Sequence, residues 1–283
     1  MNPTLGNLDG RAVLNFGDSG SADVARASAG RFGPTPAAVL DDWAAFLDWS
    51  ASVEPDAAAL DVTRLGAPVP TPRQVFAIGL NYRAHAEEAG YDTSGLPQVF
   101  TKFPSCLAGP HAVVPVASPK LDWEVELVVV IAERCQRVRE ADAWDKVAGL
   151  MVGQDLSARD VQLAGQSPQW SLGKSFANFG PTGPYLVPTA SIANRDDLRI
   201  TCQLNGEVMQ DSRTSLMIWS VPELVARLSS VATLEPGDLI FTGTPAGIGH
   251  RREPPRYLGP DDVVVSAIEG LGQLRTTFTE AAS

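Results

Sequence analysis

Residues 121–132 constrain the fold of this chain more strongly than any other stretch. They read LDWEVELVVVIA, in which acidic and apolar side chains alternate and then run into an apolar block rich in β-branched residues. This pattern predicts a strand. Because successive side chains of a strand point to opposite faces, Asp122, Glu124 and Glu126 share one face, and the apolar side chains between them take the packing face.

Glu124 and Glu126 create a problem of charge for this strand. Two residues of extended chain place their carboxylates about 7 Å apart on the same face. Carboxylates at the entrance of a buried strand repel each other, and each is costly to remove from water unless another charge cancels it. A divalent cation would supply that charge. The alternative is a solvated edge of an acidic protein.

A third carboxylate follows the next strand-like segment, residues 147–154. Asp155 stands directly after this segment, in GQDLSARD, and its spacing from Glu124 allows the two strands to run side by side. Three carboxylates from two strands, without a nearby histidine or cysteine, form an all-oxygen site that suits Mg²⁺ or Mn²⁺ and does not suit zinc. Taken alone, Asp155 is typical of a turn or a helix cap.

The segment GLNYRAHAEEAG, residues 79–90, places a histidine and a carboxylate one helical turn apart. On a short helix His85 and Glu88 share a face, so the carboxylate orients the imidazole and raises its basicity. The alternative is an ordinary surface or core histidine. Lys174 lies in the otherwise apolar and small stretch WSLGKSF, and Thr244 lies in the turn GTPAG, which brings backbone amides to a ligand. Each of these segments also fits a purely structural role.

The composition excludes several classes of protein. With 22 Lys and Arg against 33 Asp and Glu, the net charge is −11, and the chain has no basic run; this argues against nucleic acid or an anionic membrane as a partner. The 3 cysteines lack the spacing of a zinc site or a disulfide framework. The first residues lack the pattern of a secretory signal, and the apolar runs are too short for a membrane helix. We therefore expect a cytoplasmic protein.

The chain divides into two parts with different sequence patterns. These are a small N-terminal α/β appendage over residues 1–70 and a main domain over residues 71–283. In the appendage, Thr35, Pro36 and apolar residues at helical spacing predict a helix over residues 36–50. Its aromatic side chains are expected to be packing residues.

The main domain is predicted to be predominantly β. Asn205 and Gly206 predict a tight hairpin, and Ser220 with Glu223 forms a capping box that begins a helix. Strands and helices do not alternate regularly, which argues against a Rossmann fold or an α/β barrel. The segments with strand patterns are residues 75–79, 113–116, 121–132, 147–152, 198–204, 239–242 and 263–268.

Together these segments resemble the fumarylacetoacetate hydrolase family, in its bacterial acylpyruvase or 2,4-dioxo-acid hydrolase branch. The resemblance rests on GLNYRAHAEEAG, FTKFPSCLAGP, LDWEVELVVVIA, VAGLMVGQDLSARDVQ, QWSLGKSFANFGPTGPYLV, the run LNGEVMQDSRTSLMIWSVPELVARLSSVATLEPGDLIFTGTPAGIG and YLGPDDVVVSAIEGLG, in family order over residues 75–275. It implies an α+β, predominantly β fold, a mixed β-sandwich roll around a mostly buried site, commonly in a homodimer.

The resemblance also implies roles for individual residues. It assigns the binding of Mg²⁺ or Mn²⁺ to Glu124, Glu126 and Asp155, which agrees with the strand geometry. His85 and Glu88 match a water-activating pair on a mobile lid. Four further positions match contacts on the substrate side: Lys174 to a carbonyl or carboxylate, Thr244 to the carboxylate, and Arg159 and Gln162 within the Asp155 motif. The sequence departs from the family in two segments that would contact the distal end of the substrate, residues 90–96 and 250–255.

The predicted activity is metal-dependent hydrolysis of a carbon–carbon bond in a 2,4-dioxo acid, such as an acylpyruvate or a diketone from sugar-acid or aromatic degradation. The products would be pyruvate or a related 2-oxo acid and a carboxylic acid, with His85 activating the water. The alternative is decarboxylation, hydration, dehydration or isomerisation of a 2-oxo acid through a metal-bound enolate, which the metal site alone does not separate from hydrolysis. A non-catalytic protein on this fold would be expected to lack a carboxylate ligand or His85, and none is missing.

Overall fold

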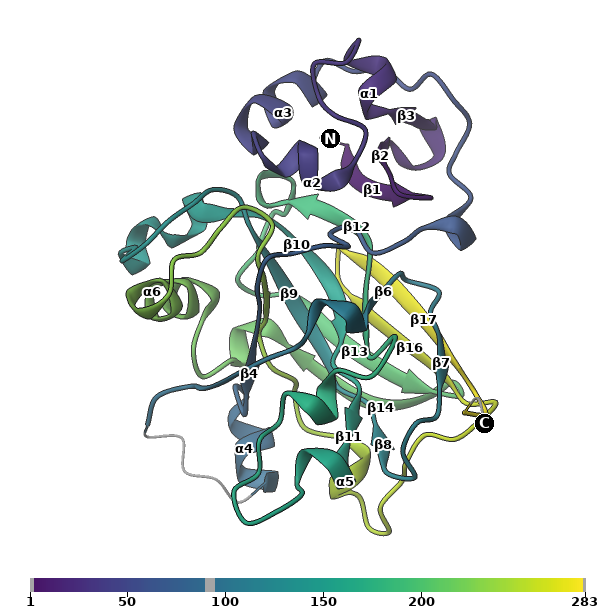
Figure 1. The fold of residues 1–283 in the computed structure, drawn as a ribbon, viewed down its shortest axis with the longest axis vertical. Coiled ribbons are helices and arrows are strands. Elements are labelled where there is room, and N and C mark those ends of the chain that lie inside the picture. Colours follow the sequence, from purple (N-terminus) through teal and green to yellow (C-terminus); the bar gives the residue numbers. More distant parts are fainter. Residues whose placement is uncertain (1–2, 90–94, 282–283) are drawn as a thin grey trace.

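The computed structural model describes residues 3–89 and 95–281 (Figure 1). In this part of the chain the largest sheet has ten strands, and it is mixed, because β15 pairs in parallel with β4 while β9 and β10 pair antiparallel. From edge to edge, the strands are β3 (Ser21–Asp23), β2 (Arg11–Asn15), β1 (Thr4–Leu8), β12 (Gly180–Pro188), β10 (Val147–Gln154), β9 (Val125–Ile131), β15 (Leu239–Phe241), β4 (Val75–Gly79) and β5 (Gln98–Thr101), with β6 (Leu107–Ala108) paired to β12 off this path.

A second, smaller sheet packs against the first and shares its apolar core. The predicted hairpin in this sheet is confirmed: Asn205 and Gly206 have φ angles of 51° and 86°, the left-handed values that such a turn requires. Its strands, in order, are β14 (Glu207–Arg213), β13 (Arg199–Leu204), β16 (Val263–Ile268), β17 (Gly272–Thr279) and β7 (Val113–Pro115), and a separate short ladder joins β8 (Leu121–Asp122) to β11 (Ser157–Ala158).

Strand β9 carries the predicted alternation through the middle of the molecule (Figure 1). Trp123, Val125 and Leu127 lie in the core between the two sheets, as predicted for the packing face. Val128 and Val130 point to the opposite face, into a second apolar cluster that includes side chains of the N-terminal part. Because both faces of β9 are covered, a charge on either face is removed from water.

The N-terminal strands extend the large sheet, since β1 pairs antiparallel with β12 at Leu5 and Leu186. Three helices pack with these strands (Figure 1). They are α1 (Val24–Ala27), α2 (Pro36–Leu40) and α3 (Trp43–Ser50). The division of the chain at residue 70 stays a prediction, and the sheet and the second apolar cluster are continuous across it.

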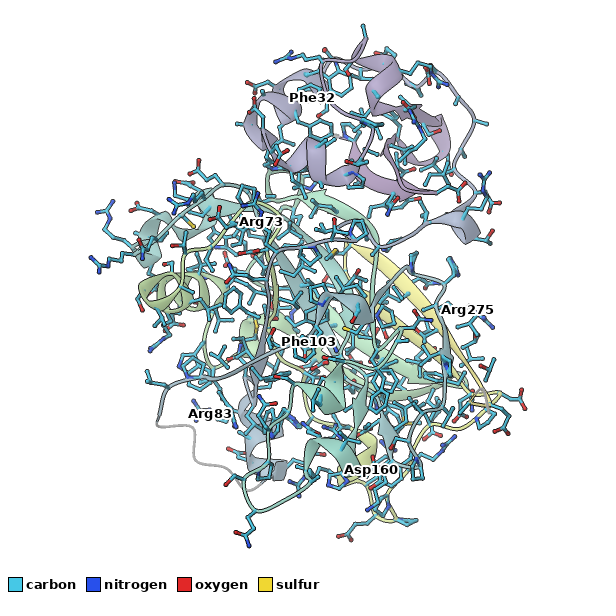
Figure 2. All side chains as sticks on the ribbon, viewed as in Figure 1. Phe32, Arg73, Arg83, Phe103, Asp160 and Arg275 are labelled. Carbon is cyan, nitrogen blue, oxygen red and sulfur yellow. The ribbon has the colours of Figure 1, made fainter. Side chains whose placement is uncertain are left out.

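The helix predicted over residues 36–50 is two helices. Thr35 caps α2 as predicted, but the chain turns after α2, and the Asp42 side chain starts α3 by accepting a hydrogen bond from the Ala45 amide at 3.3 Å. An aspartate that caps a new helix competes with continuation of the old one. The aromatic side chains do pack, for example Phe46 against Phe32, which is labelled in Figure 2.

Two short helices stand at the end of the molecule opposite the N-terminal part, near Arg83 and Asp160 in Figure 2. They are α4 (Arg83–Ala89), which follows β4, and α5 (Arg159–Gln162), which follows β11. The longer α6 (Val221–Val231) begins with the predicted capping box of Ser220 and Glu223.

The prediction of a predominantly β, α+β fold, a mixed β-sandwich roll, is confirmed. All three cysteines are buried and none forms a disulfide, also as predicted. Across residues 3–89 and 95–281, no helix combines the length and apolar character needed to cross a membrane. Among the described residues, the strands that the sequence patterns did not predict are β1, β3, β5, β6, β11, β12 and β17.

Candidate metal centre and active site

Three carboxylates meet at one end of β9 and β10. The two strands pair antiparallel, with Glu126 opposite Gly153, and the Asp155 amide donates to the Glu124 carbonyl at 2.9 Å. One oxygen atom from each of Glu124, Glu126 and Asp155 lies within 4.8 Å of the others, and all three residues are buried. The structure therefore brings together the residues from which the sequence predicted a metal site.

Two buried lysines point into this carboxylate cluster. Lys174 Nζ lies 2.7 Å from Glu124 Oε2 and 2.6 Å from Asp155 Oδ2. Lys102 Nζ lies 2.6 Å from Asp155 Oδ1 and also donates to the carbonyls of Lys174 and Phe179. Its three N–H groups are therefore all engaged within the protein.

Sequence reasoning did not single out Lys102. A signal was present, because this lysine is the only charged residue of FTKFPSCLAGP. It directly precedes Phe103, which is exposed and labelled in Figure 2, whereas Lys102 itself is 0% exposed. A lysine in an uncharged segment is a candidate for burial against a carboxylate.

Arg159 bridges two carboxylates. Its NH2 group lies 2.6 Å from Asp122 Oδ2 and 2.7 Å from Glu124 Oε1, and its NH1 group donates to Gln162 Oε1 at 2.8 Å. The sequence predicted Arg159 and Gln162 as substrate-side residues, and both line the pocket described below. The contacts of Arg159 also make it a support for Glu124.

The electrostatic environments of Glu124 and Glu126 differ. Burial disfavours the charge on Glu124, but the cations of Lys174 and Arg159 outweigh burial and lower the pKa of Glu124. Burial raises the pKa of Glu126 well above its usual range, and the neighbouring Asp155 and Glu124 add to this shift. The cluster thus has a side, at Glu126, where negative charge is not compensated.

The residues present fit a hard divalent cation. All three candidate ligands are carboxylates, which suit Mg²⁺ and Mn²⁺. Glu126 Oε2 accepts a hydrogen bond from the Gly243 amide at 2.8 Å, which fixes its orientation. A cation held by Glu124, Glu126 and Asp155 would supply the positive charge that Glu126 lacks.

His85 and Glu88 form the predicted pair on α4. The His85 Nδ1 atom lies 3.1 Å from Glu88 Oε2, and His85 is 6% exposed. If Nδ1 carries the proton that is donated to Glu88, Nε2 is the free basic atom. The imidazole belongs to the same pocket wall as Glu124 and Lys174.

One pocket collects most of the predicted site residues. Besides His85 and Glu124, it is lined by Arg159, Gln162, Lys174 and Thr244. The Thr244 hydroxyl is already engaged, since it donates to the Val125 carbonyl at 2.9 Å and accepts from Gln210 at 2.8 Å.

The rest of the pocket wall is largely apolar, with two basic side chains at one side. Sequence reasoning did not single out Phe100 and Trp170, whose rings lie 5.4 Å apart. His250 and Arg251 come from the segment 250–255, which was predicted to contact the distal end of a substrate. Of the other such segment, residues 90–96, positions 90–94 lie outside the described residues.

A mixed β-sandwich roll with a buried cluster of three carboxylates beside a pocket is typical of one family of metal-dependent enzymes. The model of the fumarylacetoacetate (FAA) hydrolase C-terminal family matches residues 74–279. The chain therefore belongs to that family, which confirms the family resemblance drawn from the sequence. The acylpyruvase or 2,4-dioxo-acid hydrolase branch stays a prediction.

The relatives name more than one reaction. The mitochondrial oxaloacetate tautomerase FAHD2A of Bos taurus is 44% identical over 208 residues, which are 73% of this chain and 66% of the relative, so the chain spans just under two thirds of that protein. A solved structure from Mycobacterium smegmatis is 47% identical, covers 98% of this chain and 99% of its own, and has a TM-score of 0.93. The fumarylpyruvate hydrolase of Pseudomonas aeruginosa, solved with Mn²⁺ and pyruvate, is 32% identical, covers 74% of this chain and 90% of its own, and has a TM-score of 0.68.

Proposed function

We propose that this chain is a divalent-metal-dependent enzyme that moves a proton within a 2-oxo acid, as in the keto–enol tautomerisation of oxaloacetate. The observation that carries the proposal is the placement of His85 on the same pocket wall as Glu124 and Lys174. A base and a cluster of candidate metal ligands are what a proton transfer next to a carbonyl requires. The similarity to an oxaloacetate tautomerase supports this reaction over the hydrolysis expected from the sequence.

The proton balance of the reaction needs one base and one stabilised oxygen. When bound by Glu124, Glu126 and Asp155, Mg²⁺ or Mn²⁺ would polarise the 2-oxo oxygen and stabilise the negative charge that develops there. His85, oriented by Glu88, would move the proton between C3 and this oxygen: to C3 when the enol becomes the keto form, and from C3 in the reverse direction. No other atom enters or leaves in this reaction.

Lys174 has a place in the same scheme. Two of its three N–H groups point to Glu124 and Asp155. The side chain also lines the pocket, and we propose that it steadies an oxygen of the bound substrate. The roles of Arg159, Gln162 and Thr244 as substrate contacts also remain proposals.

Hydrolysis of a 2,4-dioxo acid is the second candidate. The His85–Glu88 pair favours it, because an imidazole held by a carboxylate can equally deprotonate a water molecule. The similarity to a fumarylpyruvate hydrolase, solved with Mn²⁺ and pyruvate, points to the same reaction. The two candidates share the metal ligands and differ in what His85 deprotonates.

The decisive experiment follows the loss of enol absorbance from oxaloacetate with Mn²⁺ and then with chelator, and in parallel offers an acylpyruvate and identifies the products. Metal-dependent loss of the enol without carbon–carbon cleavage supports tautomerisation. Release of pyruvate and a carboxylic acid from the acylpyruvate, with no effect on oxaloacetate, would replace it by hydrolysis. His85→Asn should abolish the reaction, whereas His111→Asn, at an exposed histidine outside the pocket wall, is the matched control.

A further inference from the structure

Asp122 is a fourth buried carboxylate beside the metal centre, separate from the three candidate ligands. It is 0% exposed. Its Oδ2 accepts from Arg159 Nε at 2.8 Å and from the His250 amide at 3.0 Å. Its Oδ1 accepts from the Gly249 amide at 2.7 Å and from the Trp123 amide at 2.9 Å. Donors from two other parts of the chain therefore converge on one carboxylate.

The first of these donors, Arg159, connects Asp122 to the metal centre. The same Arg159 NH2 group lies 2.6 Å from Asp122 and 2.7 Å from Glu124. Asp122 therefore fixes the guanidinium that holds Glu124 Oε1, while Lys174 holds the other oxygen of Glu124. Burial lowers the pKa of Arg159, but Asp122 and Glu124 outweigh burial and raise it.

The other donors, the amides of Gly249 and His250, connect Asp122 to the pocket wall. The amides of Gly249 and His250 belong to the turn that carries Ile248, His250 and Arg251 into the pocket. A Cβ atom at position 249 would lie 2.7 Å from Asp122 Oδ1 and 2.0 Å from the Arg256 carbonyl, so only glycine lets the turn approach this closely. The backbone amides of this turn are therefore held in place by hydrogen bonds to the Asp122 carboxylate.

These contacts require an aspartate rather than an asparagine. Both oxygen atoms of Asp122 accept from N–H donors on Arg159, Gly249 and His250. An asparagine has one oxygen, and its NH₂ group would face donors. It would also leave the buried guanidinium with one carboxylate fewer.

We propose that Asp122 is a positioning residue that sets Glu124 for the metal through Arg159 and seats the pocket turn of residues 248–251 on the same carboxylate. The effect on the pocket rests on the proposed function, whereas the effect on the metal can be measured without activity. Groups that orient metal ligands commonly change metal affinity by about 10- to 100-fold when removed.

The test is Mn²⁺ binding by calorimetry for the unaltered protein, Asp122→Asn and Asp238→Asn. Asp238 is the matched control, because it is also 0% exposed and accepts hydrogen bonds from Gln74 and Glu235, away from the pocket. Asp122→Asn should weaken Mn²⁺ binding by about 10-fold or more, and Asp238→Asn should not. Equal affinities in the two variants, or no Mn²⁺ binding by the unaltered protein, would overturn the proposal.

A second variant guards against simple misfolding. Arg159→Lys keeps the charge but cannot reach both carboxylates in the same way, so it should also weaken Mn²⁺ binding. If Asp122 acts through Arg159, the losses in the double variant should be less than multiplicative; fully multiplicative losses would refute that route.

Measurements of activity distinguish the role proposed for Asp122 from the proposed function of the enzyme. At saturating Mn²⁺, Asp122→Asn should raise KM for oxaloacetate more than Asp238→Asn does, because the pocket turn loses hydrogen bonds from its backbone amides to the carboxylate. A KM equal to that of the control refutes the role at the turn. Normal Mn²⁺ binding without any turnover of oxaloacetate by the unaltered protein would instead refute the proposed function and leave the role of Asp122 at the metal intact.

Discussion

Lys102 offers a direct test of how the carboxylate cluster is held together. Its ammonium group is 0% exposed and contacts one carboxylate and two backbone carbonyls. Lys102→Met keeps the apolar length of the side chain but removes the charge and all three donors. Removing one partner of a buried ion pair costs about 3–5 kcal/mol, and the orphaned carbonyls do not reduce that figure. The free energy of unfolding should therefore fall by about 4 kcal/mol.

The assay is urea unfolding in the presence of chelator, so that no metal replaces the missing charge. The corresponding fall in Tm is about 7 °C, because the entropy of unfolding is about 2.1 cal/mol/K per residue. Lys146→Met is the matched control, because Lys146 pairs with Glu133 at the partly exposed surface, where such a pair contributes at most about 1 kcal/mol. If Lys102→Met unfolds at the same urea concentration as the control, the buried ammonium does not stabilise the cluster and the reasoning is refuted.

Three further predictions concern the metal, the base and the N-terminal part. Mn²⁺ at a hundred times its Kd should stabilise the protein by about 2.7 kcal/mol, and an unchanged Tm after chelation would contradict the metal centre. Glu88→Gln should lower kcat but leave Mn²⁺ affinity unchanged, since Glu88 contacts His85 and not the carboxylate cluster; a matching loss of affinity would contradict its role. A chain starting at residue 71 should aggregate, measured by light scattering, because it uncovers Leu186 on β12 and the second apolar cluster; a soluble monomer would show that the appendage is independent.

Local signals account for the parts of the fold that the sequence predicted. The hairpin at Asn205 and Gly206 depends on left-handed φ angles that these two residue types tolerate. The start of α6 depends on Ser220 and Glu223, which satisfy each other's backbone amides. In both places the residues that form the turn or the helix start are neighbours in the chain. The local sequence is therefore enough to predict the structure.

The missed strands show where such signals fail. Strand β12 reads GPTGPYLVP, and its glycines and prolines indicate a loop. In the structure β12 pairs with β10 across a register shift between Leu150 and Val152, and with β1 on the other side. Its extended form is imposed by neighbours far along the chain rather than by its own residues. The prediction of one helix over residues 36–50 failed for a different and local reason, because the Asp42 side chain caps a second helix and ends the continuation of the first.

What the sequence determined by itself is the alternation of residues 121–132. It placed Trp123, Val125 and Leu127 in the core and left Glu124 and Glu126 on the other face, because side-chain direction in a strand has a fixed period of two. From that, the need for a compensating charge followed without any knowledge of the fold.

Only the tertiary structure decided which groups meet that need. Lys174 reaches Glu124 across 50 positions of the chain, and Asp122 joins Arg159, the other cation beside Glu124, to the turn at Gly249. Any of the 22 lysines and arginines could have met the requirement for charge. The choice depends on which strands and turns pack together, and packing is a property of contacts between distant segments, which no local pattern contains.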